Sequence, residues 1–217
     1  MEKSNGRLGL CGLAMSIAGL LFMSGVFHPN DDVNGVLSPA WMPVHVCAFI
    51  ASVLVLYGLL GLYGRHGSTY GRLGFIGFVM AFSSGICLTG IALYEFTVLP
   101  ILMADPAAQS LANFQTGPIM KGSFGMILFA SFMAYFVGLI ILGIDTMRAR
   151  IVARGSVVLL LAGYAIKIAG IMVVLNVEPS GSFFDIANTL KNAGQIMLSL
   201  GYMWLGYSLW LTTRASA

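Results

Sequence analysis

Six long apolar runs constrain this chain more than any other feature of its sequence. Each run is about 20 residues long, enough for a helix rising 1.5 Å per residue to cross a hydrocarbon layer of roughly 30 Å. Of the 217 residues, 58% are hydrophobic and only 9% are charged, against about 25% in a typical soluble domain. This composition excludes a soluble globular protein and predicts an all-α, polytopic membrane bundle. The six expected transmembrane helices are Leu8–Phe27, Trp41–Tyr63, Leu73–Tyr94, Gly122–Ile144, Gly155–Leu175 and Ala193–Leu211.

The basic residues predict the orientation of these spans. With an even number of spans, both termini share one side of the membrane. The basic residues on that side are Lys3, Arg7, Arg65, Arg72, Arg148, Arg150, Arg154 and Arg214. Only Lys121 and Lys191 fall on the other side, so the positive-inside rule predicts cytoplasmic termini in a bacterial inner membrane. The net charge of +3 then reflects topology and indicates no nucleic-acid partner. We expect the first run to be retained, because His28-Pro29-Asn30 is not a small-residue cleavage site.

The first and third runs resemble each other. The segment from Gly6 to Met15 matches the segment from Gly71 to Met80 at the glycines, the arginine, the first leucine and the methionine. A repeated two-span unit inserts each time in the same orientation. We therefore predict one membrane domain over residues 1–217, built from three helical hairpins at about 7–64, 72–146 and 154–212. The alternative is that the runs look alike only because their composition is restricted.

Glycines recur at every third position near the cytoplasmic ends of the spans. Residues three and four apart share a helix face, and small residues allow helix backbones to approach closely in lipid. The three sets are Gly6, Gly9 and Gly12; Gly58, Gly61 and Gly64; and Gly71, Gly74 and Gly77. We expect a bundle that is tight at the cytoplasmic end and splayed at the outer end.

Lys167 is the most unusual residue, because it is a charged side chain within an apolar run. An ionisable side chain within a span is expected to face an oppositely charged or polar group or a water-filled cavity. Three interpretations remain open: the side chain snorkels to the outer headgroups, it pairs with a carboxylate such as Glu95, or it is a reactive amine. Glu95 ends the third run, and Lys121, Lys167 and Lys191 are the basic residues on its side. We expect a Glu–Lys pair there.

Two histidines lie near the outer ends of the first two spans. His28 ends the first and His45 begins the second, so adjacent antiparallel helices can bring them into one site. As axial ligands they could hold haem or a chlorophyll-type pigment, and we expect no other cofactor. His28, Asp31 and Asp32 could bind a divalent metal, but the sequence favours a turn there and we predict no metal site. The cysteines at positions 11, 47 and 87 are expected to be packing residues.

The leading functional prediction is a membrane protein that binds or transports a small or amphipathic molecule. The expected outward-facing polar pocket is bounded by His45, Glu95, Lys121 and Lys167. One alternative is a non-catalytic haem- or pigment-binding subunit of a redox or photosynthetic complex, using His28 and His45. Another is an intramembrane lipid-modifying enzyme with Glu95 and His45 as acid and base. Enzyme activity stays open but is disfavoured, since hydrolase and phosphate-loop motifs are missing and no catalytic residue is predicted. The expected partners are the bilayer, other membrane subunits or a second copy of the chain.

Overall fold

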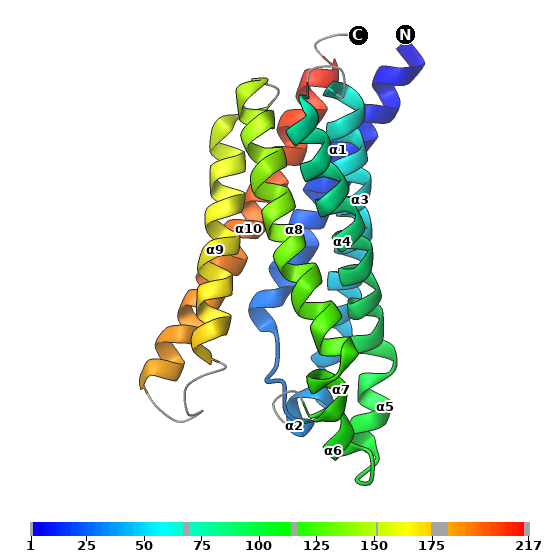
Figure 1. Ribbon diagram of the computed structural model, residues 1–217, viewed down its shortest axis with the longest axis vertical. Helices are drawn as coiled ribbons and strands as arrows, with labels where there is room; N and C mark the ends of the chain where they lie inside the picture. Colours follow the sequence, from blue (N-terminus) through cyan, green and yellow to red (C-terminus); the bar gives the residue numbers. More distant parts are fainter. Residues whose placement is uncertain (1, 67–69, 114–116, 151, 175–181, 215–217) are drawn as a thin grey trace.

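The chain is all-helical throughout the part that the structure describes (Figure 1). The computed structural model describes residues 2–66, 70–113, 117–150, 152–174 and 182–214. Six long helices form the bundle: α1 (Glu2–Phe22), α3 (Trp41–His66), α4 (Arg72–Thr97), α8 (Ser123–Arg148), α9 (Arg154–Val174) and α10 (Ser182–Arg214). Short helices connect them: η1 (Met23–Phe27), α2 (Val33–Val36), α5 (Leu99–Ala104), α6 (Gln109–Ala112) and α7 (Pro118–Lys121).

Five described segments are long and apolar enough to cross a membrane, as expected of an integral membrane protein. They are Leu8–Phe27, Trp41–Arg65, Arg72–Ala104, Ser123–Arg148 and Arg154–Val174. These segments correspond to the first five predicted spans, apart from their ends; Leu175, the predicted end of the fifth, lies outside the described residues. The sixth predicted span, Ala193–Leu211, lies within α10, which is not among the five. The count of six therefore stays a prediction.

The polarity of α10 has a structural cause. Gln195, Ser199 and Tyr202 are buried in the bundle, at 3%, 0% and 0% exposure. Outward-facing positions of the same helix carry exposed apolar side chains such as Leu200 and Trp204. The polar residues that make α10 less apolar than its neighbours thus face protein, where Gln195 and Tyr202 form hydrogen bonds. Gln195 donates to the carbonyl of Phe22 at 2.6 Å.

The long helices follow one another around the bundle in chain order. Each of α1, α3, α4 and α8 packs on the next, α9 packs along α10, and α10 returns to pack on α1. Contact between α8 and α9 is the weakest of these neighbour pairs. Both termini lie at one end, and α9 and α10 lean away from α8 toward the opposite end (Figure 1). This arrangement agrees with the expected tight and splayed ends.

Glycine contacts explain the close packing, but only in part as predicted. A Cβ added at Gly12 of α1 would lie 2.7 Å from the backbone nitrogen of Trp210 in α10, and one at Gly77 of α4 would lie 2.7 Å from that of Leu142 in α8. These two glycines allow direct backbone approach. Gly58 of α3 instead accommodates the side chain of Met15. Gly6 has no neighbour within 4 Å of an added Cβ and makes no such contact.

A second, smaller apolar core lies at the end opposite the termini. It consists of Val36, Trp41, Leu99, Met103 and Ala112, contributed by α2, α3, α5 and α6. The short helices between α1 and α3 and between α4 and α8 thereby pack together over the ends of α3 and α4. This cap holds the candidate site in place.

Candidate functional site

The site begins where the first span ends. The chain passes from α1 into η1, and His28 follows in extended conformation (φ −64°, ψ 121°). Pro29 favours that conformation, because the residue before a proline is pushed out of the helical region. The Nδ1 atom of His28 lies 2.6 Å from the carbonyl oxygen of Pro29. The ring is therefore held in a fixed orientation, with its Nε2 directed away from that carbonyl.

His45 lies in the first turns of α3, which tolerate the nearby Pro43 because the first helical N–H groups need no partner within the helix. Its Nδ1 lies 2.8 Å from the carbonyl oxygen of Trp41. The imidazole stacks on the Trp41 indole with ring centroids 3.9 Å apart. His45 is 2% exposed and Trp41 is 1% exposed. His45 is thus fixed by both a hydrogen bond and an aromatic surface.

Glu95 reaches the same place from the end of α4. The Trp41 indole N–H donates to the backbone carbonyl of Glu95 at 2.8 Å, which ties α3 to α4. Glu95 Oε2 lies 3.8 Å from His45 Nε2. Three separate segments, η1, α3 and α4, therefore bring polar groups to one point.

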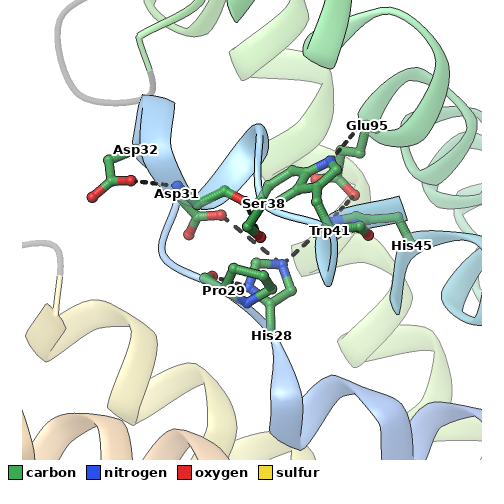
Figure 2. Close-up of polar contacts among 9 residues, drawn as sticks. His28, Pro29, Asp31, Asp32, Ser38, Trp41, His45 and Glu95 are labelled. Atoms are coloured by element: carbon green, nitrogen blue, oxygen red, sulfur yellow. Dashed lines mark hydrogen bonds and ion pairs between the residues drawn. The ribbon is translucent and has the colours of Figure 1, made fainter. Parts of the chain in front are cut away.

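The two imidazoles approach each other through their ring nitrogens, with the ring planes inclined at 64° (Figure 2). Their Nε2 atoms are 3.2 Å apart, and the Oδ1 atom of Asp31 lies 3.9 Å from His28 Nε2. We call His28, Asp31, Trp41, His45 and Glu95 the histidine cluster. Its members differ in exposure: the His28 and Glu95 side chains are each 27% exposed and that of Asp31 is 55% exposed.

Asp32 has a different role from its neighbour. Its side chain accepts a hydrogen bond from the Gly35 backbone N–H at 2.7 Å and caps the short helix α2. The turn expected from the sequence thus applies to Asp32, whereas Asp31 is directed toward His28 (Figure 2). This capping bond fixes the loop that carries both aspartates.

Two lysines add charge to the cluster from the other side of the bundle. Burial lowers the pKa of His28 to about 4, the bond to the Pro29 carbonyl opposes this change, and the charges of Lys191 and Lys167 lower the pKa further. His28 is therefore neutral at physiological pH. Lys167 of α9 also attracts Glu95, and Lys191 of α10 attracts Asp31. Among the described residues, the carboxylates of this site approach the two imidazoles, and no lysine, to within 4 Å, so Glu95 contacts His45 rather than the expected lysine.

The predicted site residues are thus only partly brought together. His45 and Glu95 are neighbours, Lys167 acts on Glu95 from a longer distance, and Lys121 is exposed at the end of α7. Trp41 was not predicted as a site residue, and Asp31 was considered only as a metal ligand with His28 and Asp32, an interpretation set aside in favour of a turn. Tryptophan at the start of a span is common at a membrane interface, so the residue type alone does not indicate that Trp41 stacks on His45 and contacts His28 edge-on.

Two cavities elsewhere in the bundle are apolar. A small internal void is lined by residues of α1, α3, α8, α9 and α10, including Met15, Leu59, Leu142, Leu160 and Tyr202. A shallow, open hollow lies between α1, α9 and α10 beside Ser16, Met203 and Trp204. Neither includes a residue of the histidine cluster.

Comparison with known protein families, with curated proteins and with solved structures finds no significant match for this chain.

Proposed function

We propose that this chain is a six-span membrane protein that binds a small polar or amphipathic molecule at the histidine cluster. The observation that carries the proposal is the convergence of two imidazoles and a carboxylate from η1, α3 and α4. Polar groups at membrane depth are costly and face partners or wet cavities. A costly cluster held by a buried indole is more readily explained by a ligand than by packing.

The sixth span of the proposal is α10. Support comes from its length of 33 residues and from its packing along both α9 and α1. Its buried polar residues never meet lipid, while its exposed face is largely apolar. Six spans also account for both termini lying at one end of the bundle (Figure 1).

The proposed setting is a bacterial inner membrane with cytoplasmic termini and the cluster in the outer half. The arginines near the ends of the helices support this orientation through the positive-inside rule. The hairpin repeat remains part of the proposal. Its support is the match between the two segments; the corresponding Gly12 and Gly77 both allow close helix approach, although Gly12 packs on α10 and Gly77 packs on α8.

Binding is favoured over transport because the half of the bundle that carries the termini is closed, whereas the other half holds the histidine cluster. The half that carries the termini is closed by the glycine contact between α1 and α10 and by the Arg65 side chain, which donates to the Thr212 carbonyl at 3.3 Å. The internal void is small and apolar. These features favour a bound ligand over one that crosses the bundle.

The haem or pigment alternative does not fit this geometry when both histidines are axial ligands of one metal. Such ligands approach a porphyrin from opposite faces, whereas His28 Nε2 and His45 Nε2 are only 3.2 Å apart. An absorbance spectrum of the purified protein tests the remaining case of a single axial histidine.

The lipid-modifying enzyme alternative retains one favourable observation. His45 Nε2 and Glu95 Oε2 are 3.8 Å apart, and catalytic hydrogen bonds are often long before a substrate binds. Assays of lipid hydrolysis or transfer with Glu95→Gln as the control address this alternative.

The binding proposal is tested by melting purified protein in detergent with a panel of fatty acids, lysophospholipids, amphipathic amines and divalent metal ions. A molecule that binds only the folded state raises the melting temperature. We expect at least one probe to stabilise the wild type and Lys121→Met, but not His45→Ala or Glu95→Gln. The proposal fails if no probe stabilises the protein, or if the effective probes act equally on all four proteins.

A further inference from the structure

The protonation of the two imidazoles follows from their backbone contacts. A carbonyl oxygen can only accept a hydrogen bond, so Nδ1 of His28 and Nδ1 of His45 both carry hydrogen. When both rings are neutral, each Nε2 therefore presents a lone pair. The two Nε2 atoms lie 3.2 Å apart, and neither carries a hydrogen that the other could accept. Two such nitrogens are stabilised at this distance when both bind one cation, either a proton or a metal ion.

We propose that this cation is a divalent transition-metal ion of the Zn²⁺ class, bound by His28 Nε2 and His45 Nε2. The inference rests on the proposed function, because it places a bound ion within the same ligand-binding cluster. Zn²⁺ binds imidazole nitrogen at about 2.0–2.1 Å in tetrahedral geometry, which places two ligand nitrogens about 3.3 Å apart. The observed separation of 3.2 Å matches this value.

The fixed Nδ1 atoms also match a metal site. Histidines that bind metals usually donate their second ring N–H to a carbonyl or a carboxylate, which sets the tautomer and the ring orientation. Here the acceptors are the carbonyls of Pro29 and Trp41. Both rings therefore present the correct nitrogen before any ion arrives.

Two carboxylates can complete the coordination. Glu95 Oε2 lies 3.8 Å from one histidine nitrogen and Asp31 Oδ1 lies 3.9 Å from the other. Both distances exceed by about 0.5 Å the separation between two ligand atoms that bind one tetrahedral Zn²⁺ ion. Among the described residues, no group of three metal-binding side chains is already close enough to hold an ion. The carboxylates must therefore close onto the ion. Asp31, with a 55% exposed side chain, is free to do so.

The positive charges of two nearby lysines limit the affinity of the site for Zn²⁺ without preventing binding. The carboxylates of Asp31 and Glu95 balance the charge of a divalent ion, but Lys167 and Lys191 act on the same groups. The ion thus competes with two ammonium groups for the carboxylates. We expect a site of moderate affinity that an added chelator can empty.

The test is calorimetric titration of ZnCl₂ into detergent-solubilised, chelator-stripped protein. We expect one Zn²⁺ per chain, with the affinity reduced at least about tenfold in His28→Ala and in His45→Ala. His66→Ala, at the opposite end of α3, is the control for adventitious binding to histidine and keeps the wild-type affinity. Because His45 is buried, the more exposed His28 is the variant that is expected to fold normally, and circular dichroism checks this.

Absence of Zn²⁺ binding by the wild type overturns the metal proposal, and so does equal binding by His28→Ala and wild type. In either case an imidazole–imidazolium pair sharing one proton becomes the explanation of the 3.2 Å contact. If Zn²⁺ fails while a fatty acid, lysophospholipid or amine from the panel still stabilises wild type and not Glu95→Gln, the metal proposal fails and the binding function stands.

Discussion

The two ends of the bundle are built on different principles. At the end that carries the termini, helices meet through Gly12 and Gly77, and the interior is mainly apolar, with the buried Thr146 and Ser156 hydroxyls donating to nearby backbone carbonyls. At the other end, short helices enclose Trp41, and imidazoles and carboxylates converge beside it. Lipid supplies no hydrophobic force between helices, so close packing must stabilise the first end. The second end holds costly polar groups in a defined geometry, which is the property expected of a ligand site.

The largest expected effect comes from Gly12→Ala at the packed end. The added methyl would lie 2.7 Å from the Trp210 backbone nitrogen and 2.8 Å from the Gly206 carbonyl oxygen. We expect a loss of about 2–3 kcal/mol of unfolding free energy, because the backbones of α1 and α10 must separate. Gly6→Ala on the same helix is the matched control, since its added Cβ has no neighbour within 4 Å. Equal stability of the two variants, measured by reversible unfolding in detergent, contradicts this view of the packed end.

Trp41→Phe tests the polar end. The substitution keeps an aromatic ring but removes the donor to the Glu95 carbonyl, which costs about 1–2 kcal/mol when the carbonyl stays buried. We also expect weaker Zn²⁺ binding, because the ring beneath His45 becomes less well fixed. Trp204→Phe is the control, since Trp204 is 45% exposed on α10. A Zn²⁺ affinity that falls equally in both variants removes Trp41 from the site.

Substitutions of the adjacent residues Asp31 and Asp32 distinguish capping of α2 from binding of Zn²⁺. Asp32→Ala removes the cap of α2 and is expected to cost about 0.5–1 kcal/mol of stability. Asp31→Ala should leave stability nearly unchanged and lower the Zn²⁺ affinity several-fold, to roughly a fifth. Melting curves and calorimetric titrations of both variants give the comparison. The reverse pattern assigns the metal-facing role to Asp32.

Lys167→Met has the smallest expected effect and the opposite sign. Removing a positive charge that attracts Glu95 frees this carboxylate for a cation, so Zn²⁺ affinity should rise by about two- to fivefold. Lys121→Met at the exposed end of α7 serves as the control. A fall in affinity for Lys167→Met would mean that the lysine orders the site rather than competing with the ion.

The sequence predicted the apolar helices well because their hydropathy is a local property. It predicted the sixth span from the same pattern, but α10 is more polar because Gln195, Ser199 and Tyr202 face the interior. Which face of a helix is buried depends on its neighbours. A window of sequence does not contain that information.

The geometry of the candidate site was predictable only where it follows from helices that are consecutive in the sequence. The proximity of His28 and His45 follows from two adjacent antiparallel spans, and the structure confirms it. The pairing of Glu95 with His45 rather than with a lysine depends on how α4 packs against α3. The different roles of Asp31 and Asp32 depend on the path of a loop. These features arise from tertiary structure and leave no periodic signal in the sequence.

The central claim is that two imidazoles at the polar end form the core of a cation site. X-ray absorption at the zinc K-edge, measured with one equivalent of Zn²⁺ per chain, tests it most directly. We expect scattering from two imidazole rings with oxygen ligands, all at about 2.0–2.2 Å, and the loss of one ring in His28→Ala. A spectrum with oxygen ligands only, or one unchanged in His28→Ala, would contradict the account.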